Sequence, residues 1–501
     1  MRAAEFLLLM SDSNAKMDAL VRTTGQALAP KDDTYDFIAI GGGTAGLVST
    51  GGLALLGLRT AIIERERLGG DCLVHGCVPS KALVFAGKVA HGARGAERWG
   101  VRTREVTVDF AAAMNRVREI RAGVAHDDSL EVTTGRGVDV IAGEARFVGP
   151  DAVKVGDATI RFKRALIGTG SRPRMPDIDG LSGHEPLTNE TVFELTERPD
   201  RLLVLGGGPI GCELSQALQR LGCEVTIVQL SERLLPREDP EASELVAKTL
   251  RAEGVTVLLD AAVERIRDHV ASVRTPGKTT EVAFDRILVA TGRVPNTESL
   301  GLEEAGVEFE RAGITVNNRL RTSNRRIYAA GDVVAGMPSF THSAWAGAEY
   351  AALNAFFPVF LGAKRRVIPR ATFTDPEVAH VGPSAEELRA QGIAFDTVST
   401  PVSHNDRATV EGESEGFARV HLVRGKDKLL AATIVGRGAS EQIVAAAHAM
   451  THGEGLAALT KTVRPYPTRS EMLRDIAYDR SIERITPMVK RMAQWWAGLR
   501  R

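Results

Sequence analysis

The stretch YDFIAIGGGTAG at residues 35–46 decides the architecture of the N-terminal half of this chain. Residues 35–40 predict a short strand, and three glycines with G-x-G-x-x-G spacing follow it directly. The first glycine permits a tight turn, the second lets a pyrophosphate approach the backbone, and the third packs a helix on the strand. A second strand ends on an acid 23 residues after the first glycine, where a ribose hydroxyl is held. This pattern predicts a dinucleotide-binding unit built on Gly41, Gly43, Gly46 and Glu64.

A cysteine pair lies just beyond this unit, in the stretch GGDCLVHGCVPSK at residues 69–81. Cys72 and Cys77 are two of only four cysteines in 501 residues. A zinc site would need further ligands, and only His75 lies nearby, so a redox-active pair is the favoured interpretation. Pro79 fits the first turn of a helix that begins near Cys77. The N-terminus of a helix stabilises a thiolate, which is the environment that a reactive thiol requires.

The nucleotide-binding pattern occurs a second time at residues 202–211, LLVLGGGPIG. A helix over residues 212–221 and a strand over residues 224–228 are predicted after it, and Gln229 lies 23 residues beyond the first glycine, in register with the first unit. The second unit uses Gly206, Gly208 and Gly211. Two dinucleotide sites beside a reactive thiol pair indicate two cofactors: one brings a hydride, and the other exchanges it for two thiols, as a flavin does.

Length and composition limit the function classes. A chain of 501 residues predicts about three domains. Lys plus Arg and Asp plus Glu balance at 63 each, which gives no global charge for a nucleic acid. No continuous apolar run approaches the roughly 18 residues of a membrane span, and residues 6–10 are too short for a signal-peptide core. We therefore expect a cytoplasmic protein whose residues 1–33 form a flexible tail.

These motifs together resemble those of the pyridine nucleotide-disulfide oxidoreductases. Residues 288–293 and 322–332 resemble two further motifs of the family, and the resemblance extends over residues 34–480. It implies a glutathione reductase-like α/β fold with two Rossmann-like domains and a C-terminal α+β dimerisation domain, which forms a homodimer. The implied segments are an FAD-binding domain at 34–180 and 300–366, an NAD(P)-binding domain at 181–299, a dimerisation domain at 367–480 and a tail at 481–501.

The resemblance also implies roles for individual residues. Cys77 faces the flavin, Cys72 exchanges with the substrate, and Lys81 forms an ion pair with Glu213 beside the flavin. The implied FAD ligands are Gly41, Gly43, Gly46, Glu64, Gly70, Lys81, Thr169, Gly170, Asp332 and His342. The implied NADPH or NADH ligands are Gly206, Gly208, Gly211, Gln229 and Gly292. An acid at position 229 would favour NADH and arginines just after it would favour NADPH, so Gln229 leaves the choice open.

The C-terminal motif departs from most of the family. Disulfide reductases carry His-Pro-Thr-x-x-Glu there as the acid–base site, whereas residues 466–471 of this chain read YPTRSE. Glu471 is retained, but Tyr466 replaces the histidine, and a phenol with a pKa near 10 is a poor proton acceptor. Mercuric reductases carry tyrosine at this position, which favours a thiophilic metal ion as substrate. They also use terminal cysteines, and no cysteine follows Cys223 in this sequence.

Three functions stay open at this point. The favoured one is NAD(P)H-dependent reduction of a metal ion or disulfide, as in mercuric reductases. The second is lipoamide- or glutathione-type disulfide reduction with a substitute proton carrier. The third is a redox sensor or membrane-associated electron-transfer flavoprotein, suggested by the paired Trp495 and Trp496 near two terminal arginines. Packing of this tail on the protein's own dimer is favoured over a membrane contact.

Overall fold

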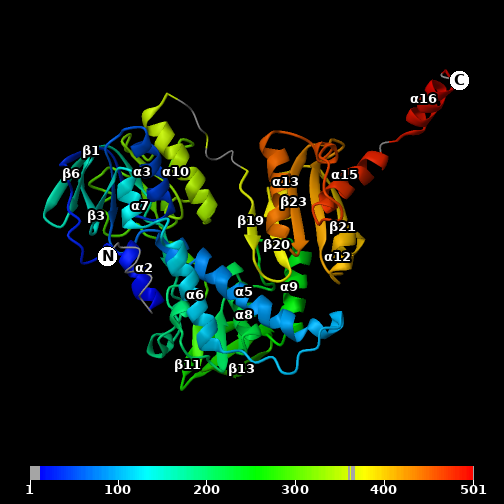
Figure 1. Ribbon diagram of the computed structural model, residues 1–501, viewed down its shortest axis with the longest axis horizontal. Helices are drawn as coiled ribbons and strands as arrows, with labels where there is room; N and C mark the ends of the chain where they lie inside the picture. The colour runs from blue at the N-terminus through cyan, green and yellow to red at the C-terminus, as the bar shows by residue number, and fades with distance from the viewer. Residues whose placement is uncertain (1–11, 359–361, 363–366, 484, 500–501) are drawn as a thin grey trace. The chain divides into compact units, whose positions relative to one another are not determined.

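The computed structural model describes residues 12–358, 362, 367–483 and 485–499 (Figure 1). They fall into two compact units. The first unit comprises Met1–Leu230 and Gly254–Arg365, and the second comprises Ser231–Glu253 and Arg366–Arg501. The mixed α/β sheets of the first unit and the separate C-terminal unit are those of the predicted glutathione reductase-like fold.

The first unit contains a seven-stranded sheet that carries the first glycine loop. Its order is β3 (Val138–Ala142), β2 (Thr60–Glu64), β1 (Thr34–Ile40), β6 (Ala158–Ile167), β5 (Ala152–Val155) and β4 (Ala145–Gly149), with β18 (Ile327–Ala329) also paired with β6. Neighbouring residues of β1 enter different apolar clusters, Phe37 one and Ile38 the other, so both faces of the sheet are covered. Helices α3 (Thr44–Leu55) and α10 (Thr341–Phe356) pack together on the Phe37 face. Because β18 comes from a late segment, this domain is discontinuous.

A second sheet, whose strands are all parallel, carries the second glycine loop. Its order is β10 (Thr256–Leu258), β9 (Glu224–Val228), β8 (Arg201–Leu205) and β14 (Arg286–Val289), and α8 (Pro209–Arg220) follows the loop. An antiparallel sheet of β11 (Ala262–Arg267), β12 (Val270–Thr275) and β13 (Lys278–Ala283) lies between β10 and β14 in the sequence. Two short pairs complete the strands of this unit: β7 (Ser171–Pro173) with β15 (Arg293–Pro295), and β16 (Phe309–Glu310) with β17 (Gly313–Ile314).

The cysteine segment and the residues after it are helical. The helices are α4 (Gly70–Val74), α5 (Cys77–Arg94), α6 (Phe110–Val124) and α7 (Leu130–Gly135). By length and hydropathy, Gly70–Arg94 is the one stretch among the described residues that passes as a membrane span. It packs instead against α6 and α8, where a Cβ on Gly87 would lie 3.1 Å from Ala217 Cα. One side of α5 is therefore packed closely within the first unit.

The N-terminal segment differs from the expected flexible tail. Helix α2 (Ser13–Val21) is capped by Asp12, and it buries Met17, Leu20 and Val21 in the same apolar cluster as Phe37. The Thr23 hydroxyl then donates to the backbone carbonyl of Glu64 at 3.1 Å. The prediction of a weakly ordered tail is therefore wrong for residues 12–23, because an amphipathic turn of helix finds apolar partners that the sequence pattern did not reveal. Residues 1–11 lie outside the described residues.

The second unit is built on an antiparallel sheet. Its order is β19 (Arg370–Thr372), β20 (Glu377–Val381), β23 (Leu429–Gly436), β22 (Phe417–Val423) and β21 (Phe395–Pro401). Its helices are α9 (Pro240–Ala252), α11 (Ala385–Ala390), α12 (Asp406–Val410), α13 (Ala439–Thr451), α14 (Ala458–Lys461), α15 (Glu471–Glu483) and α16 (Pro487–Gly498). Residues 231–253 were predicted to belong to the NAD(P) domain, but they group with this unit, where Arg419 pairs with Asp239 at 2.8 Å and Arg370 with Glu238 at 2.7 Å.

Candidate active site

The two glycine loops of the first unit have the same geometry. Gly41 and Gly206 have φ of 103° and 105°, a region that side chains rarely adopt. A Cβ on Gly46 would collide with the carbonyl oxygen of Gly41, and a Cβ on Gly211 would collide with that of Gly206. Both loops therefore require glycine for reasons of space. They present bare backbone at the start of a helix, which fits the pyrophosphate of a dinucleotide.

In both nucleotide-binding units, the side chain at the end of the second strand makes the same hydrogen bond to the glycine loop. Glu64 Oε2 accepts a hydrogen bond from Gly42 N at 2.6 Å, and Gln229 Oε1 accepts one from Gly207 N at 2.7 Å. Burial raises the pKa of Glu64, against the backbone N–H groups that lower it. The register of the two repeats thus extends from the glycines to the predicted ribose-binding side chains.

The two cysteines lie at the junction of two short helices. Cys72 is within α4, and Cys77 is the first residue of α5. Gly76 separates the helices, and a Cβ there would lie 2.8 Å from the Asp71 carbonyl oxygen. Cys77 Sγ lies 3.1 Å from Thr341 Oγ1, and Thr341 is the first residue of α10. The sulfur of Cys77 therefore lies near the N-termini of two helices, each of which favours negative charge.

The electrostatics assign different states to the two thiols. A hydrogen bond from Cys72, a hydrogen bond from Thr341 and the charge of Lys81 together lower the pKa of Cys77 to about 6, against desolvation, which raises it. The same interaction with Cys77, together with burial, raises the pKa of Cys72. A singly deprotonated pair therefore carries its charge on Cys77, the residue expected to face the flavin.

Lys81 and Glu213 form the predicted ion pair, with Lys81 Nζ 2.7 Å from Glu213 Oε2. Lys81 lies one turn beyond Cys77 on α5, and Glu213 is buried in α8. The pair is possible because α5 and α8 approach closely at Gly87. It joins the cysteine helix to the helix of the second nucleotide unit.

A hydrogen-bond network beside the cysteines was missed by the sequence analysis. Arg293 Nη2 lies 3.2 Å from Asp71 Oδ2, and Asn189 Nδ2 donates to Asp71 Oδ1 at 3.1 Å. Arg293 Nε also donates to Ser171 Oγ at 2.7 Å, and Ser171 Oγ donates to Asp332 Oδ2 at 2.7 Å. Burial raises the pKa of Asp332. The network connects α4, which contains Asp71 and Cys72, to the predicted flavin ligand Asp332. The one feature of the sequence that pointed to this network was Arg293, which directly follows the predicted ligand Gly292.

The other predicted FAD and NAD(P)H residues lie in the connecting loops. Thr169 Oγ1 donates to the Asn296 carbonyl at 2.7 Å, and Asn296 N donates to the Gly170 carbonyl at 3.0 Å. Gly70, Gly170 and Gly292 have φ of 58°, 66° and 111°, and Gly43 and Gly208 are the N-caps of α3 and α8. The ring of His342 stacks on that of Phe340, with centroids 5.3 Å apart. Their contacts to a cofactor stay predictions.

Tyr466 and Glu471 belong to the second unit, whereas the cysteines belong to the first. The Tyr466 side chain is 72% exposed, and its hydroxyl donates to Asp406 Oδ2 at 2.9 Å. The Asp406 carboxylate raises the pKa of Tyr466 above its ordinary value. Glu471 is buried, accepts a hydrogen bond from Thr468 N at 3.2 Å, and pairs with Arg474 at 2.9 Å. Their approach to the cysteines of a partner subunit stays a prediction.

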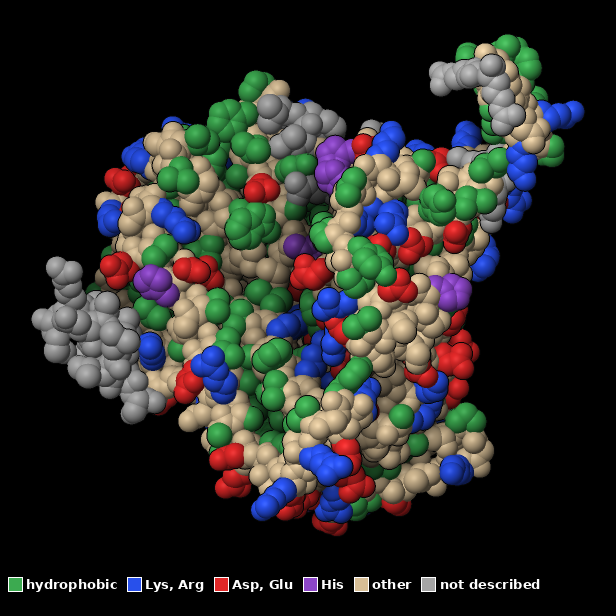
Figure 2. All heavy atoms as spheres, turned by 45° about the vertical axis from the view of Figure 1, so that its right-hand side comes forward, with side chains coloured by type: hydrophobic (Ala, Val, Ile, Leu, Met, Phe, Trp, Pro, Cys, Tyr) green, Lys and Arg blue, Asp and Glu red, His purple; other side chains and the backbone are tan. Residues whose placement is uncertain are grey.

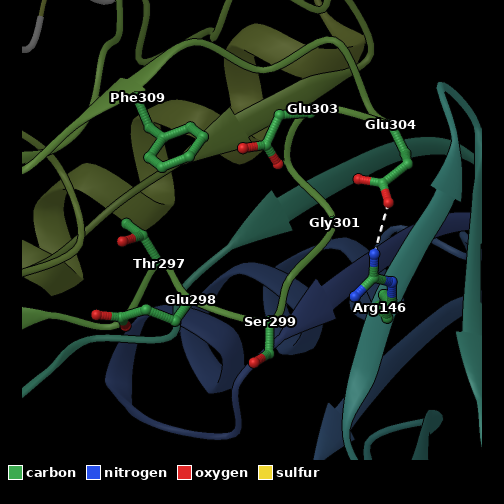
Figure 3. A pocket seen from close by; sticks show the side chains of 8 residues that line it. All are labelled: Arg146, Thr297, Glu298, Ser299, Gly301, Glu303, Glu304 and Phe309. Atoms are coloured by element: carbon green, nitrogen blue, oxygen red, sulfur yellow. Dashed lines mark hydrogen bonds and ion pairs between the residues drawn. The ribbon is translucent and has the colours of Figure 1, made fainter.

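A pocket of about 410 Å³ lies elsewhere on the first unit and contains none of the predicted site residues. Figure 3 shows Arg146 pointing toward Glu304, and the two are ion-paired at 2.5 Å. Glu298 pairs with Arg172 outside the pocket at 2.8 Å, which lowers its pKa to about 2. The pocket is therefore not part of the redox site.

Among the described residues, no group of three or more His, Cys, Asp or Glu side chains is arranged to hold a metal ion.

Comparisons with known proteins show the family of this chain. The family model "Pyridine nucleotide-disulphide oxidoreductase" matches residues 35–348, and the model of the family's dimerisation domain matches residues 368–477. The chain belongs to the pyridine nucleotide-disulphide oxidoreductase family, and it is a flavin-dependent oxidoreductase.

Similar proteins fall into different branches of that family. A mercuric reductase of Lysinibacillus sphaericus is 36% identical over 91% of this chain and 84% of its own length. A dihydrolipoyl dehydrogenase of Thermus scotoductus is 37% identical over 89% of this chain and 97% of its own length. Among solved structures, the HOCl-induced flavoprotein disulfide reductase RclA from Escherichia coli is 29% identical, with a TM-score of 0.78 over 89% of this chain and 99% of that one. Overall similarity therefore does not choose the substrate.

Proposed function

We propose that this protein oxidises NAD(P)H and passes the electrons through Cys72 and Cys77 to a thiophilic metal ion. The observation that carries the proposal is the state of Tyr466, whose hydroxyl is bonded to Asp406 and whose pKa is raised. Such a phenol is protonated at neutral pH and does not act as a base. A site that lacks its acid–base group is better suited to a substrate whose reduction requires no proton transfer.

The residues of the chain divide the work as follows. The glycine loops at Gly41 and Gly206 hold the pyrophosphates of FAD and NAD(P)H, and bound FAD supplies the conversion of one hydride into a dithiol. The Lys81–Glu213 pair fixes a positive charge near Cys77. Cys77 carries the thiolate, and Cys72, which stays protonated longer, is the thiol that exchanges with the substrate.

A metal ion is a suitable acceptor on chemical grounds. Thiolates are soft ligands that bind Hg(II) and copper strongly, and ligand exchange between thiolates requires no general base. One NAD(P)H supplies two electrons and releases one proton. The two electrons reduce one Hg(II) to Hg(0) or two Cu(II) to two Cu(I). Mercuric reductases are among the most similar curated proteins, and one RclA structure is described as a Cu(II) complex.

Disulfide reduction is the second candidate. Dihydrolipoyl dehydrogenases match this chain at 32–37% identity, as well as the mercuric reductases do. A departing organic thiolate needs a proton, and the Tyr466–Asp406 pair would have to deliver it. We place this function second because it requires the exposed phenol of Tyr466 to replace a histidine as the acid–base group.

NAD(P)H oxidation by the purified holoenzyme tests the proposal, with Hg(II), Cu(II), lipoamide and oxidised glutathione offered in parallel. The proposal expects turnover with a metal ion that is lost in Cys72→Ser, and slow turnover with both disulfides. Cys212→Ser is the matched control, since that buried thiol lies in α8 and outside the proposed reaction. Metal-dependent turnover that survives Cys72→Ser would contradict the proposal.

The assembly and the nucleotide are proposals as well. The dimerisation domain supports a homodimer. We propose that this homodimer would bring Tyr466 and Glu471 to the cysteines of the other subunit. Gln229 is neutral and therefore does not repel the 2′-phosphate of NADPH, although it can also bond the ribose of NADH. We propose NADPH or NADH as the donor and a cytoplasmic location for the reaction.

A further inference from the structure

The helix α16 at the C-terminal end is a separate feature of this chain. Thr486 caps it, with Thr486 Oγ1 accepting a hydrogen bond from Val489 N at 3.3 Å, and Pro487 occupies the first turn. The match to the dimerisation-domain model ends at residue 477, so α16 lies outside both family models. None of its described side chains is buried. Neither the fold nor the proposed reaction accounts for this helix.

The apolar side chains of α16 lie on one face. Their spacing follows i, i+4, i+7 and i+11, with two further residues beside that row. The face consists of Met488, Val489, Met492, Trp495, Trp496 and Leu499. Trp495 is 61% exposed and Trp496 57%, and their rings meet edge to face at 5.8 Å. Figure 2 shows apolar and basic side chains along this helix. Six large exposed apolar side chains on one face of a helix indicate a surface that binds a partner.

The charge of the same segment is entirely positive. Lys490 lies on the side of α16 opposite the apolar row, and Arg491 lies at the flank of that row. Over residues 484–501 the sequence has five basic residues and no acidic one, whereas the whole chain is balanced. The five are Arg484, Lys490, Arg491, Arg500 and Arg501. This local positive charge is complementary to an anionic surface.

We propose that α16 binds the surface of an anionic phospholipid membrane, with its apolar face among the acyl chains and its basic side chains at the headgroups. A basic amphipathic helix with tryptophan on the apolar face is the composition of helices that lie in the membrane interface. The sequence alone favoured packing of this tail on the protein's own dimer, but packing of α16 on a second copy of itself would bring cations together with no acid in the segment to pair them. The helix thereby attaches the oxidoreductase to a membrane without spanning it.

Flotation of the full-length holoenzyme with vesicles tests this proposal. One set of vesicles contains phosphatidylcholine alone, and the other contains phosphatidylcholine mixed with phosphatidylglycerol. We expect the protein to float with the anionic vesicles and to stay in solution with the neutral ones. High salt should release it, because the attraction of the basic residues is screened.

Two variants separate the apolar and the electrostatic contributions. Trp495→Ser with Trp496→Ser, and Lys490→Glu with Arg491→Glu, should each weaken binding to anionic vesicles by roughly tenfold or more. The matched controls are Trp99→Ser, at a tryptophan that is 53% exposed, and Arg102→Glu with Arg104→Glu, at two exposed arginines; both should float like the parent. Retained flavin absorbance verifies that every variant is folded.

Two results would overturn the proposal. One is a parent protein that does not float with vesicles of either composition. The other is flotation that the α16 variants and the control variants affect equally. In the first case, sedimentation of the parent and the double tryptophan variant identifies the alternative. If their sedimentation coefficients differ, the apolar face of α16 is a subunit contact and the membrane proposal is wrong.

Discussion

Thr341 Oγ1 lies 3.1 Å from Cys77 Sγ, so the hydroxyl at the start of α10 can donate to a thiolate at the start of α5. The two residues are 264 positions apart in the sequence. Their contact exists because α10 returns to the same sheet that carries the first glycine loop. It makes Thr341 a positioning residue for the charge of the pair.

Thr341→Val should raise the pKa of Cys77 from about 6 toward the ordinary thiol value of about 8.5, because the variant loses a hydrogen bond to the thiolate. The reduced parent should react with iodoacetamide well below pH 8, with a midpoint near pH 6. The midpoint of the variant should lie higher. Thr341→Ser restores the hydroxyl and should restore the profile. Identical profiles for all three proteins would show that the contact does not tune Cys77.

The ion pair of Lys81 and Glu213 makes a second prediction. Lys81→Met removes the ion pair of Glu213, whose side chain is 6% exposed, and the loss of a charged partner from a buried carboxylate is unfavourable. Because the lysine side chain is 37% exposed, we expect a loss of roughly 1–3 kcal/mol in the free energy of urea unfolding. Lys154→Met, at an exposed lysine of β5, is the control and should cost less than about 0.5 kcal/mol. Equal losses for the two variants would show that the pair has no structural role.

Nucleotide selectivity gives a third prediction. Gln229→Glu keeps an acceptor for Gly207 N but adds a negative charge where a 2′-phosphate would lie. The Michaelis constant for NADPH should rise by about tenfold, and that for NADH should change little. Steady-state kinetics with both donors measures the change. An unchanged NADPH constant would place the phosphate away from Gln229.

His380 gives a prediction for the pH dependence of stability. Burial lowers the pKa of His380 to about 3, and its ring nitrogens lie 2.9 Å from Thr433 Oγ1 and 2.8 Å from the Gly382 carbonyl oxygen. The unfolded chain has a histidine pKa of about 6.5, so the folded state binds fewer protons. The contribution of neutral His380 is fully present above about pH 6.5 and is lost as the pH falls toward 3.

The measurement is urea unfolding of the parent and of His380→Gln between pH 7 and pH 4. The parent should lose up to roughly 1.4 kcal/mol more per pH unit than the variant in the acid range. His421→Gln is the control on β22, two strands away in the same sheet, where burial also lowers the histidine pKa, and it should flatten the curve less. Parallel curves for the parent and His380→Gln would contradict this account.

The sequence predicted most of what depends on local pattern. The glycine loops, the second repeat and the start of α5 at Cys77 follow from spacing alone, because their geometry is set within a few residues. The network from Asp71 through Arg293 to Asp332 joins segments more than 200 residues apart, and periodicity contains no information about such contacts. Helix α2 was missed because its apolar face is only three residues wide.

Only part of the chemistry of the C-terminal motif could be predicted from the sequence. The exchange of histidine for Tyr466 was plain from the sequence, and so was its effect on the ordinary pKa of the group. The hydrogen bond from Tyr466 to Asp406 was not, because α12 and the motif are separated by about 60 residues of sheet and helix. That carboxylate makes the phenol a still weaker acid and strengthens the case against a proton-transfer role.

The most direct test of the central claim compares Tyr466→His and Tyr466→Phe with the parent, using Hg(II) and lipoamide as acceptors at neutral pH. An acid–base group contributes typically about 10²–10⁴-fold, so the parent should reduce lipoamide slowly and Tyr466→His should gain at least roughly tenfold. Reduction of Hg(II) should stay the same or weaken in Tyr466→His. A parent that reduces lipoamide rapidly, with Tyr466→Phe equally fast, would contradict the claim that this site is built for a metal ion.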